Sequence, residues 1–321
     1  MQRILIIQTA FLGDVILATP VVSELKRLFP DAKVDFLVKK GNESLLENNP
    51  HLNEVFVFDK SKGKWLSMWR LIQIFRAKKY DLVINLHRFG SSGFITALSG
   101  AKKKYGFKKN PFSFTFSKKF DHKIGNGEHE VSRNLSVIAE FGATKMIQPQ
   151  LYPSLEHKNK VDALALSNYF CFAPASVWFT KQLPKHKWIE LISIKAKKGQ
   201  IVLLGGKEDV AFCQEIIDQS GIEAKNLAGK LNLLESAYLM SKAKMNFVND
   251  SGPLHLASSM NAPVTAFFCS TIPEFGFGPL SDDSTVLQTT EKLDCRPCGL
   301  HGYRACPMGH FKCGEVDLEG C

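Results

Sequence analysis

The stretch that decides the fold is ILIIQTAFLGDVILATP, residues 4–20. The apolar run 4–7 predicts a buried strand, and the second apolar run from Val15 predicts a helix. Gly13, between the two runs, lets the backbone approach a ligand without an intervening side chain. Asp14 stands where a carboxylate commonly accepts hydrogen bonds from the unpaired N–H groups of a helix start. This order of strand, glycine turn and helix predicts the first βα unit of a parallel sheet.

The same alternation continues along both halves of the chain. In the first half, strands are predicted at 4–7, 33–38, 55–58 and 81–86, the last opening on His87, and helices at 15–28 (interrupted by Pro20), 43–48 and 65–77. In the second half, strands are predicted at 169–173, 200–204, 245–248 and 264–268, and helices at 187–197, 210–219, 233–241 and 253–260. Strands that alternate with helices in this way predict parallel, doubly wound sheets.

The length of the chain predicts two domains. It has 321 residues, which exceeds one ordinary core and suits two domains of roughly 150 residues each. Pro149 and Pro153, in a polar setting, predict a linker at 148–160. We therefore expect an α/β protein with two Rossmann-like domains, 1–155 and 156–321, that face a central cleft. Ligands of such sheets bind outside the carboxyl ends of the strands, so the loops after the strands should carry the chemistry.

Composition places the chain among globular proteins. Hydrophobic residues make up 45% and charged residues 22%. No apolar run approaches the roughly 18 to 20 residues needed to span a bilayer, and the start MQRILIIQ lacks the features of a signal peptide. We therefore expect a cytoplasmic location.

The positive charge is concentrated in the first half of the chain. The net charge is +10, and residues 1–150 hold 24 Lys and Arg against 13 Asp and Glu. The segment 60–123 holds 16 basic residues and two acids, Asp81 and Asp121. Such a segment attracts an anionic partner, which could be a nucleic acid, phospholipid headgroups or an acidic glycolipid. The alternative is a solvated face that only aids solubility.

The segment NDSGPLH, residues 249–255, predicts an anion site. Small residues form the turn after a strand, and Pro253 suits the first helical turn. The helix start offers bare N–H groups and about half a positive charge, which suits a phosphate or diphosphate near Asp250, Ser251 and Gly252. His255, one turn along, could donate to the same oxyanion. Alternatively, these residues are ordinary helix caps and a structural histidine.

Two other loops follow strands of the second half. The first offers hydroxyls and a cation that suit phosphate and sugar oxygens. The second ends a strand with two glycines and continues with two carboxylates, which suit the hydroxyls of a ribose. Their candidate residues are Ser176, Thr180 and Lys181 in the first loop, and Gly205, Gly206, Glu208 and Asp209 in the second.

Taken together and in this order, these segments resemble the lipopolysaccharide heptosyltransferases of glycosyltransferase family 9. The resemblance covers nearly the whole chain and is carried by AFLGD at 10–14, ATP at 18–20, PAS at 174–176, TKQLP at 180–184, LGG at 204–206, NLAGK at 226–230 and DSGPLHLA at 250–257. The chain departs from the family pattern at Ala175, where the family has Gly, and at Gln182 and Leu183, where it has Arg-Trp. A further family stretch matches His129, Glu130, Arg133 and Asn134, whose role is either structural or acceptor-facing.

The resemblance implies a GT-B fold, with the acceptor bound by the N-terminal domain and a nucleotide-sugar by the C-terminal domain. It assigns Asp14 as the general base of an inverting transfer, in place of the capping role that the residue alone favours. The transferred sugar would be a heptose or a related sugar from an ADP-activated donor. The acceptor would be a lipopolysaccharide inner core or another envelope glycan at the cytoplasmic face of the inner membrane. Such anionic acceptors give the basic segment a partner.

The resemblance also implies which residues would contact each part of the donor. Ser251, Gly252 and the helix after them would hold the diphosphate, with Lys181 and Ser176 supplying charge and hydrogen bonds. His255 lies at the matching motif position. The adenine would lie near the backbone of Leu231 and the ribose near Glu208 or Asp209, an alternative that stays open. The chain has no Asp-x-Asp motif, so no metal clamp on the diphosphate is expected.

The C-terminal end is rich in cysteine. Five of the eight cysteines fall in the last 27 residues, interleaved with His301 and His310. A Cys-x-x-Cys pair with further Cys and His can form a structural zinc site, but the second pair is more widely spaced than usual. We expect free thiols and no catalytic metal here. The cysteines concerned are Cys295, Cys298, Cys306, Cys313 and Cys321.

Two alternative functions remain at this point. One keeps the fold and changes the reaction to a UDP-sugar transferase or epimerase. The other is a non-enzymatic nucleic-acid-binding protein that uses the basic half, although no nucleic-acid motif or stacking platform is recognised. The sequence leaves open the sugar, the acceptor, the linkage and the oligomeric state.

Overall fold

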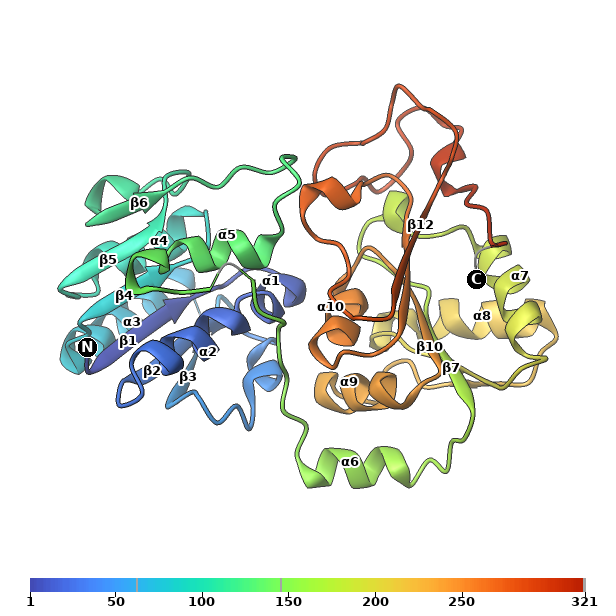
Figure 1. Ribbon diagram of the computed structural model, residues 1–321, viewed down its shortest axis with the longest axis horizontal. Helices are drawn as coiled ribbons and strands as arrows, with labels where there is room; N and C mark the ends of the chain where they lie inside the picture. The colour runs from blue at the N-terminus through green and yellow to red at the C-terminus, as the bar shows by residue number, and fades with distance from the viewer. Residues whose placement is uncertain (62, 145, 320–321) are drawn as a thin grey trace. The chain divides into compact units, whose positions relative to one another are not determined.

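The computed structural model describes residues 1–61, 63–144 and 146–319 (Figure 1). Two compact units are found, the first of Met1–Ile124 and Glu130–Tyr152, the second of Gly125–His129 and Pro153–Cys321. In each unit the described residues form a six-stranded sheet with helices between the strands, which confirms the predicted α/β class. All paired strands in both sheets run parallel.

The first unit is built on a sheet of order β3-β2-β1-β4-β5-β6. Its strands are β1 Arg3–Ile7, β2 Lys33–Lys39, β3 Glu54–Phe58, β4 Leu82–Asn85, β5 Lys103–Phe107 and β6 Lys118–Phe120. Its helices are α1 Leu12–Ile16, α2 Thr19–Leu28, α3 Lys64–Lys78, α4 Gly90–Leu98 and α5 Glu130–Ser136, with 3₁₀ turns η1 Glu43–Leu46, η2 Ser113–Thr115 and η3 Ala139–Phe141. The apolar run 4–7 is completely buried, as expected for a central strand of a parallel sheet whose two faces are covered by helices.

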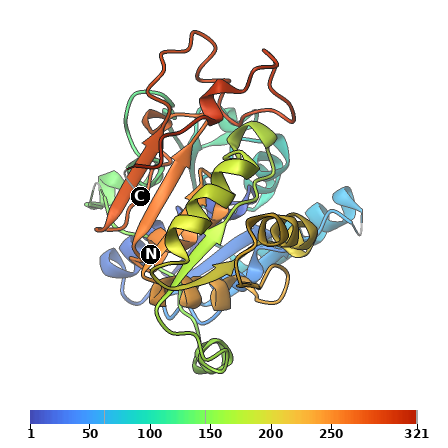
Figure 2. The same ribbon diagram turned by 90° about the vertical axis from the view of Figure 1, so that its right-hand side faces the viewer.

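The second unit has a sheet of order β12-β11-β10-β7-β8-β9. Its strands are β7 Tyr169–Ala173, β8 Gln200–Leu203, β9 Ala224–Asn226, β10 Met245–Asn249, β11 Val264–Phe268 and β12 Ser284–Gln288. Its helices are α6 Leu155–Asp162, α7 Lys185–Lys195, α8 Val210–Ser220, α9 Leu233–Lys242 and α10 Gly252–Ser259, with 3₁₀ turns η4 Phe179–Lys181, η5 Lys207–Asp209, η6 Pro273–Phe275 and η7 Lys312–Gly314. In Figure 2, α7 crosses in front of this sheet and the red C-terminal segment passes above it.

Several predicted elements differ from the structure. The helix predicted at 15–28 is two helices, because the chain breaks before Pro20, whose ring lacks a backbone donor. The helix predicted at 43–48 is only the 3₁₀ turn η1. The predicted linker contains the start of α6, which Ser154 caps by accepting a hydrogen bond from the His157 N–H. Strands β5, β6, β9 and β12 and helices α4 and α5 were not predicted.

The core of the second unit centres on Trp188, which is fully buried. Its indole packs edge-on against Phe172 and Phe267, with centroid distances of 6.2 and 5.2 Å. Phe172 in turn stacks on Phe247 at 5.0 Å. These rings come from β7, β10 and β11, so α7 is fastened to the centre of the sheet.

A buried polar contact lies in the core of the first unit. The Tyr80 hydroxyl donates to Asp35 Oδ2 at 2.6 Å, and Asn53 Nδ2 donates to Asp35 Oδ1 at 2.7 Å. Asp35 and Tyr80 are both completely buried. A carboxylate in this position depends on these donors because water cannot replace them.

Tyr80→Phe should therefore lower the free energy of unfolding of the first unit by about 1–3 kcal/mol, because Asp35 loses a donor in a buried setting. Urea unfolding followed by tryptophan fluorescence measures the change. The matched control is Tyr238→Phe, whose partly exposed hydroxyl lies 3.4 Å from Asp162 Oδ2. An equal loss in both variants would contradict the importance of the buried contact.

Candidate active site

Asp14 lies on α1, in the connection that follows β1 at the carboxyl edge of the first sheet. The Phe11 N–H donates to Asp14 Oδ2 at 3.1 Å, so the carboxylate caps the short helix, as the residue alone predicts. Gly13 precedes it and is half-buried. The cap holds one carboxylate oxygen in a defined place at the end of β1.

The carboxyl group of Asp14 has an altered proton affinity. Burial raises its pKa to about 6, and the negative charge of Glu130 acts in the same direction. The Phe11 N–H and the Arg88 guanidinium oppose this shift because they favour the ionised form. A carboxylate with a pKa near neutrality can accept a proton and later release it, as a general base must.

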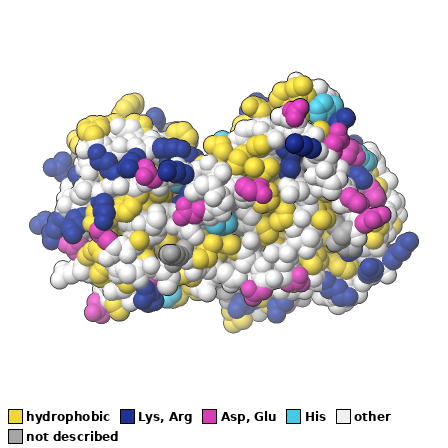
Figure 3. Space-filling view, turned by 45° about the horizontal axis from the view of Figure 1, so that its top comes forward, with side chains coloured by type: hydrophobic (Ala, Val, Ile, Leu, Met, Phe, Trp, Pro, Cys, Tyr) yellow, Lys and Arg dark blue, Asp and Glu magenta, His cyan; other side chains and the backbone are white. Residues whose placement is uncertain are grey.

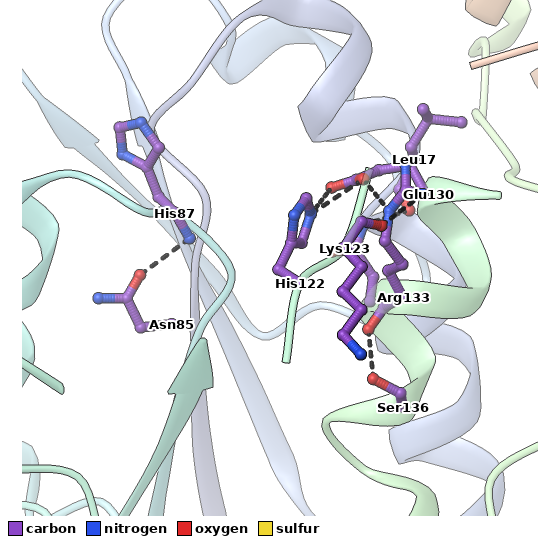
Figure 4. A network of polar contacts seen from close by, with 9 residues as sticks. Leu17, Asn85, His87, His122, Lys123, Glu130, Arg133 and Ser136 are labelled. Carbon is purple, nitrogen blue, oxygen red and sulfur yellow. Dashed lines mark hydrogen bonds and ion pairs between the residues drawn. The ribbon is translucent and has the colours of Figure 1, made fainter. Parts of the chain in front are cut away.

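Glu130 is a buried anion at the start of α5 (Figure 4). Burial disfavours its charge, but hydrogen bonds from His122 and Arg133 outweigh burial and hold its pKa below the usual range. His122 Nε2 lies 3.0 Å from both carboxylate oxygens, and Arg133 Nε donates to Oε2 at 2.8 Å. Since the ionised carboxylate can only accept, Nε2 carries the proton.

Three residues of the family stretch pack inside the first unit. Glu130, Arg133 and Asn134 are buried, and Asn134 Nδ2 donates to the Leu17 carbonyl at 3.1 Å. This bond fastens α5 to the chain between α1 and α2. His129 belongs to the segment Gly125–His129, which groups with the second unit, and its Nε2 lies 3.2 Å from the Gly278 carbonyl oxygen.

His87 follows β4, the strand next to β1, at the same edge of the first sheet. Its Nδ1 lies 2.8 Å from the Thr9 hydroxyl, which follows β1. Burial, together with the positive charges of Lys60, Arg88 and Lys39, lowers the pKa of His87 to about 4. The sequence showed a strand opening on His87 but gave no role to it or to Arg88. The signal was present, since both polar residues directly follow a buried strand.

In the second unit, a nearly buried ion pair lies at the carboxyl edge of the sheet. Lys181 Nζ is 2.7 Å from Asp250 Oδ2, and the two side chains are 15% and 7% exposed. The Thr271 hydroxyl donates to the same Asp250 oxygen at 2.6 Å. Because Asp250 directly precedes Ser251 and the start of α10, the pair fixes the Lys181 ammonium beside that helix start.

Asn249 holds the surrounding loops in place. Its Oδ1 accepts the Leu183 N–H at 2.8 Å, and its Nδ2 donates to the Pro174 carbonyl at 2.8 Å. The loop that carries Lys181 is therefore fastened to the end of β10. Ser251 does not cap α10 with its side chain; its hydroxyl lies 3.4 Å from the Asn249 carbonyl. The N–H groups that open the helix at Gly252 are thus not satisfied by that side chain.

Ser176 and Thr180 have different surroundings. Ser176 is half-buried, and its carbonyl accepts a hydrogen bond from Gln182 Nε2 at 2.6 Å. Thr180 is buried; its hydroxyl accepts the Tyr303 N–H at 2.8 Å and the Ser270 hydroxyl at 3.0 Å. These bonds make Thr180 a link to the C-terminal segment, and its predicted contact with a nucleotide stays a prediction.

In the loop after β8, the two carboxylates that the sequence left as alternatives, Glu208 and Asp209, have different surroundings. Asp209 Oδ2 accepts the Gly206 N–H at 2.8 Å, and burial raises the pKa of Asp209. Glu208 is exposed. Gly205 approaches Asp209 so closely that a Cβ there would lie 2.7 Å from the Asp209 Cβ, which accounts for a glycine at this position.

Leu231 and His255 lie in different parts of the second unit. Leu231 is half-buried and precedes Asn232, whose side chain caps α9 by accepting the Glu235 N–H at 2.8 Å. His255 is buried on α10, with its ring 6.5 Å from that of Phe277. The structure thus brings Lys181, Asp250 and the start of α10 together, while Leu231 belongs to another loop.

The cysteine-rich segment braces the loop after β11. The Arg296 guanidinium donates to the carbonyls of Phe268, Cys269 and Thr271 at 3.1, 2.6 and 2.8 Å. Thr271, which holds Asp250, is therefore fixed by a segment to which the sequence assigned no site role. For Thr271 a signal was present, because Ser270 and Thr271 closely follow the last predicted strand of the second half; for Arg296 no local signal was found.

The cysteines of the described residues are free thiols. Among residues 1–61, 63–144 and 146–319, no group of three or more Cys, His, Asp or Glu side chains is arranged to hold a metal ion. Cys321, part of the predicted cysteine-rich tail, lies outside the described residues.

Each of the two units is a parallel α/β sheet with polar loops at its carboxyl edge, which is the architecture of the GT-B fold. The model of glycosyltransferase family 9 (heptosyltransferase) matches residues 68–302. Lipopolysaccharide heptosyltransferase 3 of Escherichia coli K12 is 31% identical over 280 residues, which cover 81% of this chain and 80% of that protein. The chain therefore belongs to glycosyltransferase family 9, as the sequence motifs predicted.

Solved structures support the fold. The family 9 glycosyl transferase of Veillonella parvula has a TM-score of 0.81 and 24% identity, covering 90% of this chain and 86% of that one. The E. coli heptosyltransferase WaaC with ADP-2-deoxy-2-fluoro heptose has a TM-score of 0.72 and 20% identity, covering 89% and 92%. Both share the two-sheet α/β architecture with this chain.

The proton affinity of Asp14 can be measured directly by following its ¹³C-labelled carboxyl carbon by NMR as pH changes. We expect a pKa of about 6 in the wild type. Arg88→Gln should raise this pKa because a favourable positive charge is lost, and Glu130→Gln should lower it because a neighbouring negative charge is lost.

Glu130→Gln disturbs a buried network, so its fold is checked by circular dichroism, and Arg88→Gln gives an independent reading. A wild-type pKa near 4 that neither substitution moves would contradict the electrostatic account of this site.

Proposed function

We propose that this protein is an inverting glycosyltransferase that moves a heptose or a related sugar from ADP-heptose, or a similar nucleotide-sugar, to an anionic envelope glycan, with the lipopolysaccharide inner core as the leading candidate. The observation that carries the proposal is the position of Asp14, a half-buried carboxyl that accepts the Phe11 N–H in the connection after β1 and whose pKa burial raises to about 6. Membership of family 9 and the E. coli relative that acts on lipopolysaccharide support the substrate class.

The reaction uses the first unit for the acceptor. The ionised Asp14 carboxylate removes the proton of an acceptor hydroxyl while that oxygen attacks the anomeric carbon of the donor. The new glycosidic bond forms as the bond from the anomeric carbon to the diphosphate oxygen breaks. Attack from the face opposite the leaving group inverts the anomeric configuration. The proton ends on Asp14, and the nucleoside diphosphate carries away the bonding electron pair.

The second unit would hold the donor. The Lys181 ammonium and the N–H groups at the start of α10 would neutralise the diphosphate as charge develops on it. Ser176, Ser251 and His255 would add hydrogen bonds, and the backbone near Leu231 would receive the adenine. Because Asp209 is committed to the Gly206 N–H, we assign the ribose hydroxyls to the exposed Glu208. The relative whose structure holds an ADP-heptose analogue supports an adenine nucleotide.

A donor screen tests the proposal. Purified protein is incubated with a deep-rough lipopolysaccharide acceptor and either ADP-heptose or a panel of UDP-sugars, with and without EDTA. Mass spectrometry should find an acceptor heavier by one heptose only with ADP-heptose, and EDTA should leave the rate unchanged because Lys181 and α10 would carry the charge. Transfer or epimerisation with UDP-sugars alone, or salt-resistant RNA binding without transfer, would favour the alternatives.

Asp14→Asn should reduce kcat by about 10²- to 10⁴-fold, because the amide cannot accept the acceptor proton. The dissociation constant of ADP-heptose, measured by calorimetry, should stay nearly unchanged. The exposed Asp31→Asn is the matched control and should keep wild-type turnover. Normal turnover of Asp14→Asn would remove this residue from the mechanism.

Lys181→Ala should instead weaken ADP-heptose binding by about 10- to 100-fold, the range expected for losing a hydrogen bond to a charged group. Lys185→Ala provides the control, because Lys185 is the next lysine along the chain and pairs with Glu215 at 2.5 Å on the surface. An unchanged dissociation constant in a folded Lys181→Ala protein would contradict the diphosphate assignment.

A further inference from the structure

The first unit exposes a set of large apolar side chains that the proposed chemistry does not use. Trp65 is 69% exposed and Phe114 is 73% exposed. Leu66, Trp69 and Phe89 are also exposed. We call these five residues the aromatic surface. Monomeric proteins rarely leave so many large apolar side chains in water at one place unless the surface binds something.

A row of packed rings connects two members of the aromatic surface, Trp65 and Phe114. Trp65 packs edge-on against Phe94 at 6.0 Å, Phe94 against Phe112 at 5.7 Å, and Phe112 stacks on Phe114 at 6.1 Å. This row of rings joins α3, α4 and the η2 turn. Two exposed members, Trp65 and Phe114, are thus connected through packed rings.

A buried amide connects two of these elements, α4 and the η2 turn. Asn110 Nδ2 donates to the carbonyls of His87 and Phe89 at 2.9 and 3.2 Å. Gly93 makes room for this amide, since a Cβ there would lie 2.0 Å from Asn110 Oδ1. The loop after β5 is therefore tied to the loop that begins α4.

The aromatic surface lies at the carboxyl edge of the first sheet. The N-terminal ends of α3 and α4 follow β3 and β4, and η2 follows β5. All strands of this sheet are parallel, so these segments lie at the edge where Asp14 follows β1. The surface and the proposed base thus share one edge of one unit.

Lysines accompany the aromatic surface. Lys60, Lys64 and Lys109 are exposed in the segments that carry it, and the Lys64 ammonium lies 5.7 Å from the centre of the Trp65 ring. Figure 3 shows Lys and Arg side chains interspersed with hydrophobic ones on the face of the first unit that this view presents.

The acidic residues nearby do not cancel this charge. Asp121 pairs with Lys108 at 3.0 Å and Asp59 with Lys40 at 2.9 Å. Asp81 precedes β4 and accepts the N–H groups of Gln2 and Arg3, at the opposite edge of the sheet. The aromatic surface therefore has a positively charged surrounding.

We propose that the aromatic surface docks the protein on an anionic phospholipid bilayer. Indole rings prefer the headgroup level of a membrane because they carry both an apolar body and a polar N–H, and Phe and Leu side chains at the same face bury at the boundary with the acyl chains. Lysines beside them attract the negative surface. Among the described residues no helix has the length and apolarity to cross a bilayer, so such attachment would be peripheral. A second copy of the chain fits less well, because two positively charged surfaces would repel.

The link to catalysis rests on the proposed function. A bilayer at this edge would present lipid-anchored glycans beside the loop that carries Asp14. Docking itself requires no sugar chemistry, so the two proposals can fail separately.

Sedimentation with vesicles tests the docking. Vesicles contain phosphatidylcholine with 30% phosphatidylglycerol, or phosphatidylcholine alone, without donor or acceptor. The wild type should bind the anionic vesicles, and 0.5 M NaCl should weaken the binding because it screens the lysines. The Trp65→Ser, Trp69→Ser double variant should lose on the order of tenfold in partition coefficient per indole ring, from the apolar area each ring withdraws from water. Lys64→Gln and Lys109→Gln should each cost about fivefold.

The matched controls are Leu155→Ser and Val177→Ser, which remove side chains of 73% and 77% exposure from the second unit and should bind as the wild type does. Absence of binding to anionic vesicles would overturn the proposal, as would equal binding by the double tryptophan variant. If size-exclusion chromatography shows a dimer of the wild type and a monomer of the double tryptophan variant, the surface would instead bind a second copy of the chain.

An activity assay separates docking from catalysis. With a water-soluble, delipidated core glycan, the double tryptophan variant should transfer sugar at the wild-type rate. With the acceptor embedded in anionic vesicles, its rate should fall in proportion to the lost binding. Docking without any transfer would leave this inference intact and remove the proposed function.

Discussion

Parallel strand pairing is the constraint on which both units depend. A parallel strand cannot be joined to its neighbour by a tight hairpin, so each strand is followed by a crossover that returns the chain to the starting edge. The loops after the strands consequently gather at the carboxyl edge of each sheet. Thr9, Asp14 and His87 gather in this way in the first unit, and Lys181, Asp250 and Thr271 in the second.

Each unit contains a buried ionic contact near its proposed site residues. In the first unit, Glu130 is an anion held between His122 and Arg133, and its charge adds to burial in raising the proton affinity of Asp14. In the second unit, Asp250 and Thr271 hold the Lys181 ammonium beside the start of α10. Removing one partner of such a pair would leave a buried charge without compensation, which costs stability. The two arrangements suit opposite tasks, proton removal and stabilisation of a negative leaving group.

The sequence predicted the strands whose residues are mostly buried. β1, β7, β10 and β11 are continuous or nearly continuous apolar runs, because each is covered on both faces, and each was found. β5 and β6 contain paired lysines and β12 begins with Ser-Thr, so their apolar pattern is too weak to recognise. The helix predicted from 15 to 28 is two helices, because Pro20 has no backbone N–H to continue the hydrogen bonding of the first one.

The candidate site could be predicted only in part, for a different reason. Asp14, Lys181 and Asp250 stand in local motifs, and each motif indicates a residue type and a helix start. Their partners lie far along the chain. Lys181 forms an ion pair with Asp250, 69 residues away, and the negative charge of Glu130 on α5 raises the pKa of Asp14. No spacing rule contains such contacts, because they depend on how the elements pack. Arg296, which fixes Thr271, was missed for the same reason.

The central claim is that Asp14 is the base and that its surroundings set its proton affinity. It is tested most directly by measuring the pH dependence of kcat/KM for heptose transfer alongside the NMR titration of the Asp14 carboxyl. Because the base must be deprotonated, kcat/KM should rise with pH through about 6, and the kinetic and NMR pKa values should agree within error. A rate that rises through a different pKa, or that stays constant from pH 5 to 8 while Asp14 titrates near 6, would contradict the account.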